Sequence, residues 1–269
     1  MSDFLAKIVE RKKNEVLEAK SAIPVPMLEK MPGFFREVIS LKDVFLEKRN
    51  SGFSPIIAEI KRASPSRGIM HVDLDVEKLA TAYQSGGAVA ISILTDREGF
   101  GGTAEDIKLV RDKVFIPVLR KDFIVDPYQV YESRAIGADI ILLIASAITP
   151  NECFSLSGLA KSLGLDVLLE IHEEHEVENY NNEYVDFVGI NNRNLKTLKV
   201  DIETSVSLFD KLPKSSIKIS ESGISEVSTL VALKNKGFDL FLVGEIFMRE
   251  KNPGEAFLNF VRDFRNHIS

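Results

Sequence analysis

Short apolar runs alternate with longer amphipathic stretches along most of the chain. Eight of these runs predict β-strands, because each is short, rich in Ile, Val and Leu, and followed by apolar residues at helical spacing. The predicted strands are Ile56–Lys61, Ala88–Leu94, Ile116–Lys121, Ile140–Ile144, Val167–Glu170, Phe187–Asn191, Ile217–Ser220 and Leu240–Val243. Eight strand–helix repeats in a row favour an α/β fold of the closed (β/α)8 TIM-barrel type over an open doubly wound sheet.

The segment ahead of the first strand has a different pattern. Apolar residues recur at helical spacing from Phe4 to Lys20, two prolines then end this pattern, and a polar-rich helix is expected from Phe35 to Lys48. We therefore expect residues 1–52 to form an N-terminal helical extension. No linker or low-complexity stretch follows it, so residues 1–269 are expected to form a single barrel domain.

Composition and charge narrow the class of partner. The formal net charge of −6 argues against general attraction to nucleic acid or anionic lipid, and no apolar run resembles a signal peptide or a membrane span. Cys153 is the single cysteine, so neither an intrachain disulfide nor a thiolate metal cluster can form. We expect a cytoplasmic protein with a small-molecule partner.

Ionisable residues stand where the apolar strands end. A charge inside a buried parallel strand costs several kcal/mol unless it is paired, and the carboxyl ends of barrel strands are where catalytic residues lie. With a side-chain period of two, one face of each strand end carries these residues: Glu59 and Lys61, Lys121 and Phe123, Glu170, and Asn191 and Arg193. Together they predict acid–base chemistry. The alternative is a salt-bridged plug for the barrel end.

The last two strands end in a different chemistry. Ser220-Glu221-Ser222-Gly223 and Val243-Gly244-Glu245 both place glycine between a strand and a helix. Backbone N–H groups in such turns suit a phosphate group, although each glycine can also be an ordinary turn residue. The loop 62–68, with Ser64, is expected to close over a substrate, or otherwise to be solvated surface.

Two motifs point away from a cofactor. The cluster from Gly99 to Thr103 lacks the dinucleotide-binding spacing and is expected to form a flexible active-site loop. The run from His172 to His175 lacks the spacing of a zinc-binding motif, and no third ligand stands out. We expect neither a metal ion nor an organic cofactor.

The motifs resemble those of the indole-3-glycerol phosphate synthase family over nearly the full chain. The resemblance rests on IAEIKRASPSRG (57–68), LRKDFI (119–124), LE (169–170), GINNRNL (189–195) and SESGI (220–224). It implies a tryptophan-pathway enzyme that closes the ring of 1-(2-carboxyphenylamino)-1-deoxyribulose 5-phosphate to form indole-3-glycerol phosphate, with loss of CO2 and water. It also implies no cofactor, and it makes other enzymes of the pathway candidate partners.

The resemblance implies roles for individual residues. Lys121 would be the general acid of ring closure, and Glu170 would assist proton removal or stabilise the cationic intermediate. Lys61, supported by Glu59, would hold the substrate carboxylate and act as the acid in dehydration. Asn191 and Arg193 would orient the aromatic part and the hydroxyls of the substrate, and Glu221 would hold the ribulose hydroxyls or support the acid–base network. Phe123 would also bind the substrate. The phosphate would be held by Ser64, Ser222, Gly223, Gly244 and the Glu245 backbone. Ile246 departs from the small residue common at that place in the family.

Two rival functions stay open. Another phosphosugar barrel could use Lys121 to form a Schiff base with a carbonyl substrate. A barrel without catalytic activity could bind the phosphorylated ligand as a regulatory subunit, but the complete acid–base set argues against it.

Overall fold

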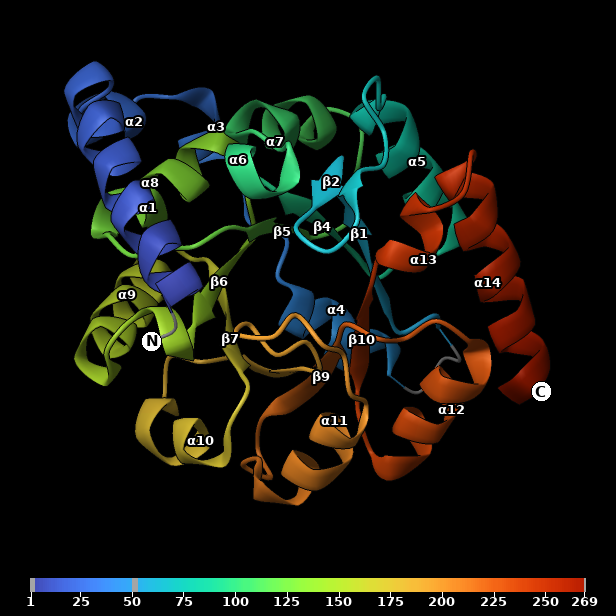
Figure 1. Ribbon diagram of the computed structural model, residues 1–269. Coiled ribbons are helices and arrows are strands. Elements are labelled where there is room, and N and C mark those ends of the chain that lie inside the picture. Colours follow the sequence, from blue (N-terminus) through green and yellow to red (C-terminus); the bar gives the residue numbers. More distant parts are fainter. Residues whose placement is uncertain (1–2, 50–52, 269) are drawn as a thin grey trace.

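The computed structural model describes residues 3–49 and 53–268, and at its centre eight parallel strands form a closed barrel (Figure 1). The circle closes where the first strand, β1, pairs with the last, β10. The strands are β1 (Ile56–Ile60), β4 (Ala90–Leu94), β5 (Val118–Lys121), β6 (Ile140–Ile144), β7 (Asp166–Ile171), β8 (Phe187–Asn191), β9 (Ile217–Glu221) and β10 (Leu240–Val243). The predicted barrel is confirmed, and the ends of the predicted strands shift by no more than two residues.

Helices surround the barrel on its outside, as Figure 1 shows. The long helices that follow the strands are α5 (Val76–Gly86), α7 (Ala104–Arg111), α8 (Pro127–Ile136), α9 (Pro150–Ser162), α10 (Glu174–Tyr180), α11 (Glu203–Leu208), α12 (Val227–Lys236) and α14 (Pro253–Ile268). Shorter elements are the hairpin of β2 (Ala63–Ser64) and β3 (Gly68–Ile69), α6 (Arg97–Phe100), η1 (Ala145–Ala147), η2 (Phe209–Lys211) and α13 (Glu245–Met248). No helix of the described residues is long and apolar enough to cross a membrane.

Local residues set the ends of these helices. Asp75 and Asp126 accept backbone N–H groups in the first turns of α5 and α8, which satisfies donors that have no partner inside the helix. Gly87 and Gly137 follow the last turns with φ of 94° and 93°, a conformation that glycine adopts without steric cost. Each βα unit is therefore bounded by its own sequence.

Alternate residues of a strand face two apolar layers. In β1, Ile56, Ala58 and Ile60 pack in the layer between the strands and the outer helices, whereas Ile57 packs in the barrel interior. Glu59 shares the face of Ile57. The strand period thus directs this carboxylate into the barrel, where it needs a partner.

The N-terminal extension contacts both ends of the barrel. It consists of α1 (Asp3–Ala22), α2 (Val25–Leu28), α3 (Pro32–Phe35) and α4 (Leu41–Lys48). Leu5 of α1 and Phe45 of α4 belong to the same apolar cluster as the barrel interior. Ser40, just ahead of α4, donates a hydrogen bond to Asp166 at the start of β7, while α1 reaches the carboxyl ends of the strands. One continuous segment therefore covers the two openings.

A buried carboxylate fixes the extension to the barrel. Asp139 lies just before β6, is fully buried, and forms ion pairs with Arg36 of the extension and with Arg111, at 2.5 Å for the latter. It also accepts the backbone N–H groups of Ile39 and Val118, at 2.8 and 2.9 Å. Asp139 thus joins the extension to the start of β5.

The extension also contains the main departure from the sequence-based helices. The prediction of one helix from Phe35 to Lys48 is wrong at its start, because residues 36–40 are not helical and α4 begins at Leu41. Asp139 draws Arg36 and the Ile39 N–H toward the barrel, so a tertiary contact overrides the helical pattern. The expected boundary at residue 52 lies outside the described residues.

The glycine cluster after β4 is more compact than the predicted loop. Gly99 lies in the short helix α6, and a Cβ at Gly102 would lie 1.8 Å from the carbonyl oxygen of Leu94. Glycine is required there because the turn packs directly against the end of β4. This packing holds α6 beside the mouth of the barrel.

We expect Asp139→Asn to lower the free energy of unfolding by about 3 kcal/mol, because the change leaves two partly buried guanidinium groups without their counter-charge. Urea unfolding measures this. The control is Asp210→Asn, which breaks the ion pair with Lys236 at a carboxylate that is 73% exposed and should cost less than about 1 kcal/mol. Equal losses in the two variants would contradict the role assigned to Asp139.

Candidate active site

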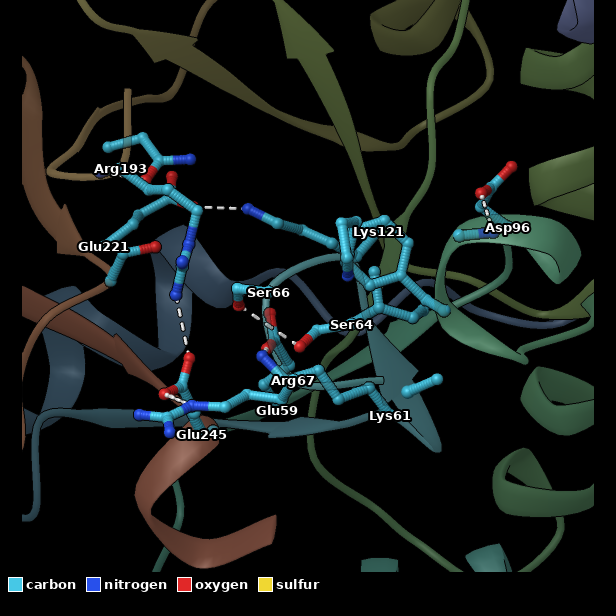
Figure 2. Close-up of a pocket in the computed structure, with 18 of the residues that line it drawn as sticks. Glu59, Lys61, Ser64, Ser66, Arg67, Asp96, Lys121, Arg193, Glu221 and Glu245 are labelled. Atoms are coloured by element: carbon cyan, nitrogen blue, oxygen red, sulfur yellow. Dashed lines mark hydrogen bonds and ion pairs between the residues drawn. The ribbon is translucent and has the colours of Figure 1, made fainter. Parts of the chain in front are cut away.

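A cavity of about 1090 Å³ opens at the carboxyl ends of the barrel strands. Figure 2 shows several of its charged side chains pointing toward one another from separate strands and loops. The cavity brings together all the candidate site residues from the sequence: Glu59, Lys61, Ser64, Lys121, Phe123, Glu170, Asn191, Arg193, Glu221, Ser222, Gly223, Gly244 and Glu245. Their individual roles stay predictions.

Lys121, the last residue of β5, forms ion pairs with two buried carboxylates. Its Nζ lies 2.9 Å from Oε2 of Glu170 on β7 and also contacts Oε2 of Glu221 at the end of β9. The side chains of Glu170 and Glu221 are only 3% and 1% exposed. Asn191, the last residue of β8, donates from Nδ2 to Oε1 of Glu170 at 3.0 Å. The ammonium group is therefore held in place between strands on opposite sides of β8.

Sharing one ammonium group between two carboxylates separates their pKa values. Burial raises the pKa of Glu221 to about 8, because Lys121 offsets only part of that effect and Glu170 adds repulsion. Burial also acts to raise the pKa of Glu170, but Lys121, His172 and the Asn191 hydrogen bond outweigh it and lower the pKa to about 2. Burial acts to lower the pKa of Lys121, yet the carboxylates outweigh it and raise that pKa. The shared ammonium group therefore favours the charged form of Glu170 more than that of Glu221.

Lys61 and Glu59 form a second pair on one face of the chain at the end of β1. Lys61 Nζ donates to Oε1 of Glu59, and the two side chains are 10% and 8% exposed. A Cβ at Gly244, after β10, would lie 2.6 Å from the Cβ of Glu59. Gly244 therefore leaves the space that Glu59 occupies. Gly189 in β8 does the same for Glu221, whose Oε1 would lie 2.2 Å from an added Cβ.

A third cluster of charges lies between the ends of β8 and β10. Oε2 of Glu245 is 2.8 Å from Nη2 of Arg193, and its Oε1 is 3.1 Å from Nε of Arg67, as Figure 2 shows. Arg67 lies in the turn between β2 and β3, so Glu245 joins this hairpin to the loop after β8. The backbone N–H of Arg193 donates to Oδ1 of Asn191 at 2.9 Å, which orients the loop.

The loops after β1 and β9 bring hydroxyl groups to the same cavity. Ser222 and Gly223 have φ of 64° and 79°, and the positive φ of Ser222 is a strained conformation for a residue other than glycine. Nδ2 of Asn192 donates to the carbonyl oxygen of Ser222 at 3.0 Å and stabilises this turn. Across the cavity, the hydroxyl groups of Ser64 and Ser66 lie 3.4 Å apart.

Sequence reasoning missed the apolar part of the cavity wall. Among the residues concerned, from four segments, are Ile8, Phe100, Leu142, Ile144, Leu195 and Leu198. An apolar residue at a strand end fits the same sequence pattern whether it packs in a core or faces a ligand. The sequence therefore could not indicate that Leu142 and Ile144 line the cavity. Such a wall suits an aromatic ring.

It also missed the contribution of α1, whose Lys7 and Arg11 line the cavity. Nη2 of Arg11 lies 2.7 Å from Asp96, and the buried Lys12 lies 2.8 Å from Asp96 and 3.0 Å from Asp122. These ion pairs fix α1 across the mouth. The helical pattern predicted the helix, but nothing in it indicated which part of the barrel the helix covers.

Within residues 3–49 and 53–268 the structure has no group of three or more His, Cys, Asp or Glu side chains suited to a metal ion. His172 lies beside Glu170, with Nε2 3.4 Å from Oε1, whereas the side chain of His175 is 65% exposed. These two histidines therefore face different surroundings.

Comparisons with known proteins agree on one family. The family model described as indole-3-glycerol phosphate synthase matches residues 5–260. Proteins named indole-3-glycerol phosphate synthase from Bacteroides thetaiotaomicron and Polaromonas naphthalenivorans are 42% and 40% identical to this chain. The first match covers 97% of the chain and 99% of its relative, and the second covers 95% and 97%.

A solved structure supports the fold alone. Tryptophan synthase subunit alpha from Legionella pneumophila superposes with a TM-score of 0.62 at 14% identity, covering 85% of this chain and 97% of that one. At this identity the likeness extends to the barrel and not to the chemistry of the cavity.

The pKa of Glu221 predicts a pH dependence of stability. A folded-state value of about 8, above the ordinary 4.5, means that Glu221 contributes stability below pH 4.5 and that this contribution is lost as pH rises through 8. We expect the melting temperature of the wild type to fall, relative to that of Glu221→Gln, by roughly 5 °C or more between pH 5 and pH 8.5. Calorimetry at several pH values measures the difference. Glu47→Gln, a change at an exposed side chain, is the control, and its melting temperature should follow that of the wild type at every pH. The prediction is refuted if the difference between the wild type and Glu221→Gln does not change with pH either.

Proposed function

The chain belongs to the indole-3-glycerol phosphate synthase family, and from that premise we propose which residues of its cavity act in each step of the reaction. The enzyme is a carboxy-lyase of tryptophan biosynthesis. It closes the ring of 1-(2-carboxyphenylamino)-1-deoxyribulose 5-phosphate to give indole-3-glycerol phosphate, CO2 and water. The reaction needs two proton donations, because the carbonyl oxygen is protonated once during ring closure and again when it leaves as water.

Lys121 is the acid of ring closure. The ring carbon that bears the carboxylate forms a bond to the ribulose carbonyl carbon, and the carbonyl oxygen takes a proton as negative charge develops on it. The ammonium group of Lys121 is fixed between Glu170 and Glu221 in a site with little access to water. There it can donate a proton without a prior rearrangement.

Glu170 stabilises the cationic intermediate. Ring closure leaves positive charge on the aromatic amine until CO2 departs and returns its bonding electrons to the ring. The low pKa of Glu170 keeps this carboxylate charged throughout, and the hydrogen bond from Asn191 holds it in position. Glu170 is also placed to take the proton that the carbon beside the nitrogen loses during dehydration.

Lys61 is the acid of dehydration and the partner of the substrate carboxylate. The hydroxyl group formed in the first step leaves as water with a proton from Lys61, and the carbon–carbon double bond that forms makes the five-membered ring aromatic. Glu59 holds the ammonium group of Lys61 at the end of β1. Lys61 and Lys121 come from separate strands, which supports one acid for each step.

The substrate lies across the cavity with its phosphate toward β9 and β10. Ser64, Ser222, Gly223, Gly244 and the backbone N–H of Glu245 bind the phosphate, while Glu221 binds the ribulose hydroxyls. Phe123 and the apolar wall contact the aromatic ring, and Arg193 and Asn191 orient it. The phosphate dianion and the carboxylate of the substrate suit a cavity that is lined by Lys61, Arg67 and Arg193.

The protonation state of Lys121 is the observation that favours this proposal over a Schiff-base mechanism. A lysine that attacks a carbonyl group must be a neutral amine, which usually requires a lowered pKa. Here Glu170, Glu221 and Glu59 outweigh burial and raise the pKa of Lys121, so the group is an ammonium ion and a proton donor.

We further propose that the chain acts as a single barrel domain in the cytoplasm, without nucleic-acid or membrane partners, and that other enzymes of the pathway are its candidate protein partners.

We expect Lys121→Ala to lower the rate of indole formation by about a thousandfold or more, because it removes the proton donor of ring closure. The assay supplies the carboxyphenylamino-deoxyribulose phosphate and follows indole absorbance. Lys113→Ala, at an exposed lysine on the outside of the barrel, should retain full activity. Borohydride is added during turnover as a further test. A stable adduct on Lys121, or no turnover by folded wild-type protein, would overturn the proposal.

A further inference from the structure

Glu245 lies where two arginines from separate loops meet. One oxygen of its carboxylate contacts Arg193 at 2.8 Å, and the other contacts Arg67 at 3.1 Å. The three side chains line the same cavity as Ser64 and Ser222, and the side chain of Glu245 is only 24% exposed. A carboxylate thus occupies the cationic part of a cavity whose substrate carries a phosphate.

The carboxylate of Glu245 is charged at neutral pH. Burial acts to raise its pKa, but the hydrogen bond from Arg67 and the charges of Arg193 and Lys61 outweigh burial and lower it. The carboxylate of Glu245 therefore supplies the counter-charge for Arg67 and Arg193. A phosphate dianion near this carboxylate would be repelled by it and attracted by Arg67.

We propose that the carboxylate of Glu245 is an internal competitor of the substrate phosphate: it forms ion pairs with Arg67 and Arg193, and it gives up Arg67 when the phosphate binds. This inference deepens the proposed function, since it rests on the assignment of the phosphate to this side of the cavity. Arg67 is the partner released because it lies in the exposed hairpin turn and its side chain is 50% exposed, against 21% for Arg193.

Competition of this kind determines specificity. A dianion attracts Arg67 more strongly than the single charge of Glu245 does, whereas an anion with one charge gains no advantage over it. Glu245 also recaptures Arg67 when the product phosphate leaves, so the same contact weakens product binding. The enzyme thereby selects a doubly charged terminal group without holding it too tightly.

The test measures the dissociation constant of inorganic phosphate by isothermal titration calorimetry. Glu245→Gln keeps the shape of the side chain and removes its charge, so phosphate should bind roughly 5- to 20-fold more tightly than to the wild type. Glu250→Gln, at an exposed neighbour, should leave the dissociation constant unchanged. Phosphate that binds Glu245→Gln equally or more weakly overturns the proposal.

The same substitution in an Arg67→Gln variant distinguishes competition for Arg67 from simple repulsion between Glu245 and the phosphate. Arg67→Gln alone should weaken phosphate binding, and adding Glu245→Gln to it should restore no more than about 2-fold, because the contested partner is gone. The same gain in both backgrounds would show that Glu245 repels the anion without competing for Arg67, and would also overturn the proposal. Glu245→Ala repeats the test if the glutamine variant folds poorly. None of these measurements requires turnover, so they stand apart from the failure or success of the ring-closure assay.

Discussion

The buried ammonium group of Lys121 is the constraint on which the site depends. A charge removed from water costs several kcal/mol unless close partners surround it, and its partners Glu170 and Glu221 come from strands on either side of β8. Three strand ends must therefore converge to satisfy one lysine. Barrel closure produces that convergence, so the fold and the chemistry require the same geometry.

Much of this arrangement follows from local sequence. The period of two in β1 placed Glu59 and Lys61 on one face, and the ion pair between them agrees with that reading. The alternation of strands and helices was sufficient to predict the barrel. The ends of helices such as α5 and α8 are set by local caps and turns. Where a property belongs to a few consecutive residues, the sequence is sufficient to predict it.

Properties that join distant segments could not be predicted in this way. Lys121 and Glu221 are one hundred residues apart, and no spacing rule names one as the partner of the other. The extended segment before α4 and the place of α1 over the mouth are both decided by buried aspartates of the barrel, Asp139 and Asp96. The strand next to each of these aspartates can be predicted from the sequence, but the segment that binds the aspartate cannot.

Closure between β1 and β10 also orders the events of folding. Ribosomal synthesis produces β1 long before its neighbour β10. The edge of β1 that faces β10 therefore stays unpaired until synthesis has passed Val243. Helix α1 likewise binds Asp96 and Asp122, which lie far from it along the chain. The active site is therefore a property of the closed ring that no fragment ending before β10 shares.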